Sequence, residues 1–160
     1  MAKEKAYEKT CVQLVLINEG TYNLERPLII KCPISIHGDG QDKTILYGEG
    51  IAIQGTKEEK KRVDMQGMTM KGSKGSGLEG DNGLSFLCKD MTFTQCGYHG
   101  VYADNTKGRF INCVITQCGG SGIYCSENTL VELEGSQTKV DGNGTSGFGS
   151  ALAIPMTHRP

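Results

Sequence analysis

Ionisable and aromatic side chains recur at regular intervals in this 160-residue chain, at two neighbouring positions of a repeat. Tyr102 and Tyr124 are 22 residues apart, and Glu79 lies 23 residues before Tyr102. Asp81 and Asp104 are also separated by 23 residues. Carboxylate and phenol groups transfer protons in general acid–base catalysis, and they also form hydrogen bonds with polar ligands. Their recurrence predicts one continuous polar surface that could bind a ligand or act on it.

The repeat includes the glycines and turns around these positions. Gly77, Gly100 and Gly122 are separated by 23 and 22 residues. The stretch 94–97 (Thr-Gln-Cys-Gly) returns as 116–119 after 22 residues. A period of this length is typical of solenoids, in which short supersecondary units stack on one another. We therefore expect equivalent residues to lie above one another in successive coils.

Each repeat contains three short segments with strand character. Leu78, Val101 and Ile123 alternate with polar or aromatic neighbours, and successive residues of a strand point to opposite faces. We expect these three aliphatic residues to lie in the core and their neighbours to face outward. Two further alternating segments, 84–86 and 91–93, follow in the first copy. A unit this small cannot bury its apolar face alone, so stacking is required.

These features resemble the right-handed parallel β-helix superfamily, which includes pectate lyases, polygalacturonases, alginate-modifying enzymes and carbohydrate-binding or sugar-hydrolase repeat domains. The opening segments 19–22, 27–30, 34–38 and 44–48 are similar to the family's first coil. The resemblance implies an all-β fold, a single-stranded right-handed parallel β-helix of about five or six coils with 22–24 residues each. It favours polysaccharide chemistry, but one fold hosts many functions, so activity must be argued from a site.

We expect one β-helix domain over residues 12–154, with different structure at its ends. Residues 1–11 are charged and favour a short N-terminal capping helix, because an open solenoid end exposes unpaired strand edges. Residues 155–160 are expected to form a C-terminal tail. The charge run 56–62 is interpreted as a solvated loop or, alternatively, as a contact arm for an acidic partner.

The composition argues against several classes of partner. Seventeen basic and 18 acidic residues give a net charge of −1, which provides no broad field to attract nucleic acid or an anionic membrane. The sequence shows no export signal and no run of about 18 apolar residues. We expect an intracellular, cytoplasmic protein that is a monomer in isolation, or a domain of a larger protein. The absence of a Cys-x-x-Cys pair or clustered His predicts no metal site, and we expect no cofactor.

Seven cysteines are present, and most lie on or beside expected core strands. Reduced thiols that pack as small apolar side chains are the expectation. Stacking of Cys96 on Cys118 would place their Cα atoms about 4.8 Å apart, which is within the range that a disulfide spans. A cytosolic setting argues against that bond.

Three columns of outward side chains are expected beside the repeated strand. They are Ser76, His99 and Ser121; Glu79, Tyr102 and Tyr124; and Asp81, Asp104 and Ser126 with Glu127 nearby. In the family that the chain resembles, extended polysaccharides lie on the outer face of such a strand stack. The resemblance therefore favours ligand binding by Glu79, His99, Tyr102, Asp104, Tyr124 and Glu127.

The leading hypothesis is a non-catalytic recognition module that binds an extended glycan or a protein segment on this face. It rests on the polar columns and on missing catalytic signatures of the family, since the sequence has no Asp-Asp pair, Gly-His-Gly, Arg-x-x-Arg or Arg-x-Lys. A structural spacer is a further alternative. Some candidates also have structural explanations. His99, Asp81 and Asp104 are typical of turns, and the tyrosines could form a cross-coil pair.

An enzyme is the main alternative, namely a small polysaccharide lyase, C5-epimerase or hydrolase that acts on an acidic polysaccharide. In a lyase or epimerase, His99 or Tyr102 would remove the proton α to a uronate carboxylate and Tyr124 would return one. A hydrolase would use Asp81 and Asp104, whose stacked Cα atoms are expected about 5 Å apart, nearer the retaining separation. The asparagines that follow, Asn82, Asn105 and Asn128, are interpreted as stacked turn residues.

Overall fold

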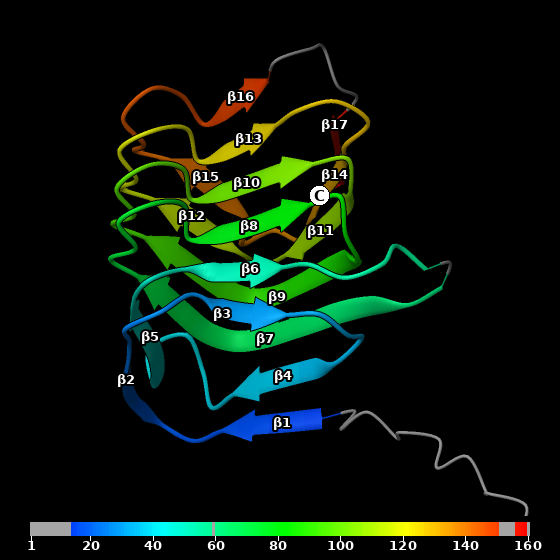
Figure 1. The fold of residues 1–160 in the computed structure, drawn as a ribbon. Coiled ribbons are helices and arrows are strands. Elements are labelled where there is room, and N and C mark those ends of the chain that lie inside the picture. Colours follow the sequence, from blue (N-terminus) through cyan, green and yellow to red (C-terminus); the bar gives the residue numbers. More distant parts are fainter. Residues whose placement is uncertain (1–13, 59, 151–155, 160) are drawn as a thin grey trace, which may run out of the picture.

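The structure is a computed structural model that describes residues 14–58, 60–150 and 156–159. These residues form 17 strands and no α-helix, and every strand pair is parallel. The strands wind into a solenoid of stacked coils (Figure 1). The all-β parallel fold is thus confirmed, whereas the expected capping helix of residues 1–11 lies outside the described residues.

One wall of the solenoid is a six-stranded sheet whose strands follow one another along the axis (Figure 1). It contains one strand from each of six coils, in the range that the sequence predicts. Its strands are β3 (Leu28–Ile30), β6 (Ile51–Ile53), β8 (Leu78–Asp81), β10 (Val101–Asp104), β13 (Ile123–Cys125) and β16 (Phe148–Ser150).

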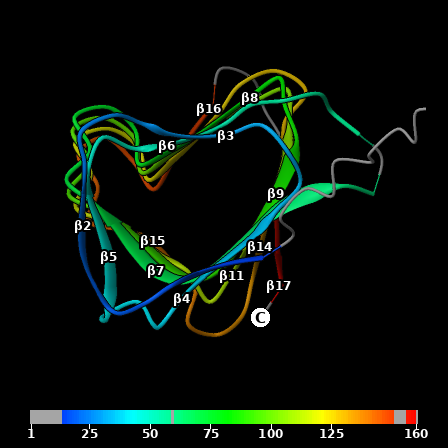
Figure 2. The same cartoon turned by 60° about the horizontal axis from the view of Figure 1, so that its bottom comes forward.

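The other two walls form an eleven-stranded sheet that bends around a corner (Figure 2). One wall contains β1 (Leu14–Ile17), β4 (Ser35–Gly38), β11 (Lys107–Ile111), β14 (Leu130–Glu134) and β17 (Met156–Arg159). The next contains β2 (Gly20–Leu24), β5 (Thr44–Gly48), β12 (Val114–Thr116) and β15 (Lys139–Asp141). The ten-residue strands β7 (Arg62–Lys71) and β9 (Ser85–Thr94) run through both walls.

Two details differ from the expected arrangement of strands. Segments 84–86 and 91–93 do not form separate strands, because β9 continues through both and bends at Asp90, which has a φ of 49°. Residues 156–159, expected to lie in a tail, form β17 and pair with β14. The described coils therefore continue beyond residue 154.

The core follows the predicted alternation. Leu78 pairs with Val101, Val101 pairs with Ile123, and all three side chains are fully buried. Phe110 packs edge-to-face against Phe86 at a ring-centroid distance of 5.8 Å, and it also contacts Phe93. Burying an aliphatic or phenylalanine side chain contributes about 1.5–3 kcal/mol. Stacked core columns are therefore the main source of stability between coils.

The coils turn at three corners whose backbone is left-handed. Positive φ angles occur in three columns of residues: Asn82, Asn105 and Asn128; Gly67, Asp90, Asn112 and Gly135; and Gly72, Gln95, Gln117 and Gly142. Such angles are costly for most L-residues and least so for Gly and Asn. The Asn105 side-chain amide also donates a 2.7 Å hydrogen bond to Asn82 Oδ1. The prediction that these asparagines are stacked turn residues is confirmed.

Residues 56–58 and 60–61 of the charge run are exposed between β6 and β7, as predicted for a solvated loop, and Arg62 begins β7. The loop projects away from the stack at one corner (Figures 1 and 2). Lys57 extends along the axis and donates a 3.3 Å hydrogen bond to Asn105 Oδ1, two coils further on. The hydrogen bond thus holds the loop against the column of corner asparagines.

Substitution of Asn105 tests the role of the left-handed corner. We expect Asn105→Ala to lower the free energy of unfolding by about 1–3 kcal/mol, because alanine strains at a φ of 44° and cannot bond Asn82. Asn105→Gly should lower the free energy of unfolding less, because glycine adopts this φ without strain and only the hydrogen bond is lost. Urea denaturation of both variants measures the difference. Equal losses would contradict the strain explanation.

Candidate functional site

The predicted polar columns meet on the outer face of the six-stranded sheet. Tyr102 pairs with Glu79 on one side and with Tyr124 on the other, while Asp104 pairs with Asp81. We call the surface formed by Glu79, Asp81, Tyr102, Asp104, Tyr124 and Glu127 the tyrosine face. Glu79, Asp81 and Glu127 are exposed, whereas the two tyrosines and Asp104 are half-buried. The structure therefore brings these candidate residues together on one side of three successive strands.

Aromatic rings stack at the centre of the tyrosine face. The Tyr102 and Tyr124 rings are nearly parallel, with an interplanar angle of 5° and centroids 5.8 Å apart. The His99 ring stacks on Tyr124 with a centroid distance of 4.8 Å, and Tyr98 covers His99 from the corner at 4.0 Å. Such aromatic contacts contribute about 0.5–1.5 kcal/mol beyond area burial. They fix the positions of both tyrosines before any ligand arrives.

His99 is buried beneath this cluster and not exposed as the sequence analysis expects. Only 6% of its surface is accessible, and Ser76 and Ser121 of the same column are also buried. The burial of these three side chains differs from the exposed column that the sequence predicts, although the His99 ring stacks on the outward Tyr124 ring. His99 is buried because the Tyr98 and Tyr124 rings both pack against it.

The hydrogen bond of His99 restricts its chemistry. The Ser121 backbone N–H donates to His99 Nδ1 over 3.0 Å, so Nδ1 is an acceptor and the proton of the neutral ring is on Nε2. Burial lowers the pKa of His99 below its ordinary value of 6.5. The Nδ1 lone pair of the neutral imidazole already accepts the Ser121 N–H, so His99 is suited to positioning the turn. The same lone pair is not available to accept a proton from a substrate.

The carboxylates of the face are held by polar neighbours. Asp81 accepts a hydrogen bond from the Asn82 side-chain amide, and Asp104 accepts one from the Ser126 hydroxyl. Within the described residues, neither aspartate forms an ion pair, and the same holds for Glu79 and Glu127. The tyrosine face is therefore acidic.

Two exposed residues near the face were missed by the sequence analysis. Tyr98 is 60% exposed at the corner, and Ile29 on β3 is 51% exposed. Ile29 lies in the same outward column as Glu79, because β3 pairs with β6 and β6 with β8. Because Leu28, Ile29 and Ile30 are all aliphatic, no polar alternation in the sequence could have marked Ile29 as outward.

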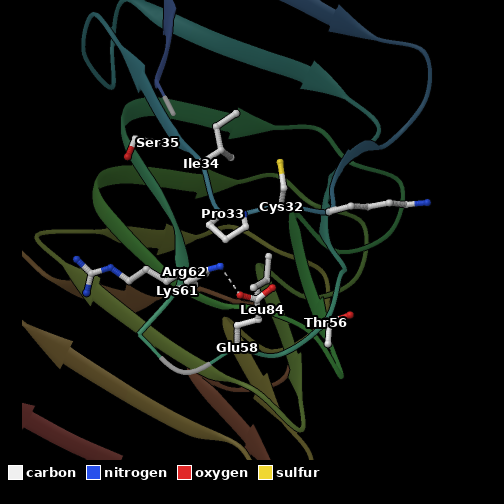
Figure 3. A pocket seen from close by; sticks show the side chains of 10 residues that line it. Cys32, Pro33, Ile34, Ser35, Thr56, Glu58, Lys61, Arg62 and Leu84 are labelled. Atoms are coloured by element: carbon white, nitrogen blue, oxygen red, sulfur yellow. Dashed lines mark ion pairs between the residues drawn. The ribbon is translucent and has the colours of Figure 1, made fainter. Parts of the chain in front are cut away.

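A hollow lies beside the projecting loop, at the corner between β3 and β4 (Figure 3). It has a volume of about 610 Å³. Cys32, Pro33, Ile34 and Leu84 supply its apolar lining. Lys31, Ser35, Thr56, Glu58, Lys61 and Arg62 supply its polar lining. No motif in the sequence predicted this cavity, since it depends on how the loop leaves the coil.

Three of the four charged side chains that line this hollow form ion pairs. Lys61 Nζ lies 2.6 Å from Glu58 Oε2, and Figure 3 shows the two side chains pointing toward each other. Arg62 extends away from them and binds Asp64 Oδ1 through Nε at 2.6 Å. An anionic ligand would have to displace these carboxylates. The hollow is thus a weaker candidate site than the tyrosine face.

Groups suited to metal binding or membrane crossing are not found in the described ranges. No three His, Cys, Asp or Glu side chains of residues 14–58, 60–150 and 156–159 lie close enough to hold a metal ion. No helix in this part of the chain is long and apolar enough to cross a membrane.

Stacked three-walled coils of parallel strands define the protein as a β-solenoid. The chain belongs to the right-handed beta helix family, because residues 23–152 match the family's right-handed beta helix region. This confirms the superfamily that the sequence resembles, while the pectate-lyase-like and carbohydrate-binding subtypes stay predictions.

One solved structure, ORF18 of Geobacillus virus E2, is similar to the chain with a TM-score of 0.56 and 17% sequence identity. The similarity covers 81% of this chain but only 31% of the viral protein. At this identity the likeness shows a shared fold alone. No curated protein matches the chain in sequence.

The buried, neutral state of His99 predicts a pH dependence of stability. Below pH 6.5 the unfolded chain binds a proton at His99 before the folded chain does, so the free energy of unfolding should fall as the pH is lowered from 7 towards 5. His99→Asn keeps an acceptor for the Ser121 N–H but does not titrate, and it should weaken this dependence. Thermal melts at both pH values measure the effect, with His37→Asn on β4 as the matched control. An unchanged dependence in His99→Asn would contradict the assignment.

Proposed function

We infer that the chain is a non-catalytic recognition module that binds an extended, uncharged glycan along the tyrosine face. The observation that carries this proposal is the row formed by Glu79 and the two stacked tyrosine rings, with a second row beside it that contains Asp81 and Asp104. Tyr102 and Tyr124 present an aromatic strip, and Glu79 and Asp104 lie beside it. Aromatic rings pack on the apolar faces of sugars, and carboxylates accept hydrogen bonds from sugar hydroxyls.

The regular spacing of the strands supports an extended ligand. Equivalent residues repeat every 4.7–4.9 Å along a parallel sheet. A linear polymer that lies along the axis would meet a similar set of groups at each coil. The rings and corner asparagines are already fixed by their own contacts, which reduces the entropy lost on binding.

Charge favours an uncharged ligand over an acidic one. Glu79, Asp81, Asp104 and Glu127 carry negative charges that no Lys or Arg of the described chain neutralises by an ion pair. Each carboxylate within about 4 Å of a like charge opposes binding by about 1 kcal/mol even in bulk water. The acidic polysaccharide of the enzyme alternative fits this surface poorly.

The geometry also supports binding without turnover. A lyase needs a base that can reach substrate, whereas His99 is buried and its Nδ1 accepts the Ser121 N–H. Asp81 and Asp104 are hydrogen-bonded to Asn82 and Ser126, as turn residues would be. General acid–base catalysis requires groups free to exchange protons with the reacting atoms.

Removal of both tyrosine rings tests the proposal. On an array of neutral and acidic glycans, we expect the wild type to bind neutral chains and Tyr102→Ala/Tyr124→Ala to lose about tenfold or more in affinity, since central aromatic residues dominate recognition surfaces. Tyr47→Ala removes an exposed tyrosine from β5 on another wall and should bind normally. Circular dichroism checks that all three proteins are folded.

Other outcomes would reject or redirect the proposal. Binding of acidic glycans alone would contradict the charge argument, and shortened or unsaturated products from a bound glycan would establish an enzyme. Absence of binding to any glycan would overturn carbohydrate recognition. The protein-segment and spacer alternatives would then replace it.

A further inference from the structure

Two cysteines occupy equivalent positions in successive coils. The strands β9 and β12 pair in register up to Thr94 and Thr116, two residues before Cys96 and Cys118. The register continues through the corner, because the Gly119 N–H donates a 2.8 Å hydrogen bond to the Cys96 carbonyl oxygen. In-register residues of neighbouring parallel strands have Cα atoms about 4.8 Å apart, which lies within the range spanned by disulfides.

The two thiols are enclosed at the same corner of successive coils. Cys96 and Cys118 are each 2% exposed, and each thiol donates to a backbone carbonyl oxygen two residues before it, Thr94 and Thr116 respectively. Gln95 Nε2 donates a 3.2 Å bond to Gln117 Oε1 just before them, which ties the two corners together on the outside. The backbone therefore holds the two cysteines in the fixed register that a disulfide between coils requires.

We propose that Cys96 and Cys118 form a reversible oxidation site, at which a peroxide joins two successive coils by a disulfide. The three other buried cysteines of the described residues, Cys88, Cys113 and Cys125, do not share this geometry. Cys88 pairs with Phe110 and Cys125 with Ala103 across their strands. Cys113 contacts the Cys88 backbone carbonyl oxygen, with 3.3 Å between its sulfur and that oxygen.

The chemistry of the pair is balanced with hydrogen peroxide as the oxidant. The Cys118 thiolate attacks one peroxide oxygen, the O–O bond breaks, and Cys118 becomes a sulfenic acid while hydroxide leaves. The Cys96 thiol then attacks the Cys118 sulfur, so the S–S bond forms and the S–O bond breaks. The hydroxyl group leaves as water with the Cys96 proton. The two thiols lose two electrons, and the peroxide is reduced to two waters.

The electrostatics of the pair distinguish the attacking sulfur from the resolving one. The interaction with the neighbouring Cys96 thiol lowers the pKa of the Cys118 thiol, while the same interaction, together with burial, raises the pKa of Cys96. Burial raises the pKa of Cys88, Cys113 and Cys125 instead. Because the thiolate is the reactive form, Cys118 is the first to react among these buried residues.

The disulfide would fix the corners that lead into the tyrosine face. Cys96 is followed by Tyr98 and His99, and Cys118 is followed by Ser121, whose amide binds His99. Closing a loop of 22 residues restricts the unfolded chain and stabilises the folded one. Since in-register side chains are parallel, the sulfurs bond only with some local adjustment, which favours ready reduction.

The test is peroxide treatment of the wild type, followed by alkylation of remaining thiols and peptide mapping. Trypsin separates residues 90–107, which contain Cys96, from residues 110–139, which contain Cys113, Cys118 and Cys125. We expect a cross-link between these peptides that dithiothreitol reverses. The thermal unfolding midpoint should rise by about 5–10 °C on oxidation.

Variants identify the partner and keep the proposal falsifiable. Cys118→Ala and Cys96→Ala should each lose the cross-link and the shift of the midpoint, whereas the buried control Cys113→Ala should keep both. A cross-link that survives in Cys118→Ala would overturn the assignment, as would oxidation of the wild type to sulfinic acids alone. If one alanine variant does not fold, prior alkylation of the wild type should still abolish the cross-link.

Discussion

The structure depends on left-handed backbone turns that recur at equivalent corners of successive coils. Such a turn changes the direction of the chain sharply, so that the next strand lies in register on its equivalent in the coil before it. Asn82, Asn105 and Asn128 provide this turn at one corner, and the Asn105 amide bonds Asn82 in the coil before it. Because L-residues rarely adopt such angles, the corners restrict residue choice more strongly than the strands do. The register of all three walls follows from them.

That register converts a sequence repeat into a surface. Residues that share a position in the repeat become neighbours, so Leu78, Val101 and Ile123 form a core column while Tyr102 and Tyr124 stack outside. The same rule applies to polar groups, since acidic residues at a repeated position produce a row of negative charge. One tyrosine or carboxylate on a single coil would offer a ligand only one contact. Repetition of such residues in successive coils makes a continuous binding surface.

The sequence was most informative where the period of 22–23 residues holds. It predicted the parallel coils, the core column, the stacked asparagines and the residues that meet on the tyrosine face. It could not predict the burial of His99, because that burial depends on packing against Tyr98 of its own coil and Tyr124 of the next coil. The continuity of β9 was missed because Asp90 makes a bend without ending the hydrogen bonding. The hollow beside the loop depends on tertiary placement that no local pattern encodes.

The loop between β6 and β7 leaves the register undisturbed on both sides. Ile51 pairs with Leu78 before it, and Arg62 pairs with Ser85 after it. Extra residues at this corner are therefore accommodated outside the stack, and a longer flexible loop costs little more in closure entropy. The corner is a natural grafting position, where a foreign peptide or a small domain could be displayed on a rigid rod at a known coil.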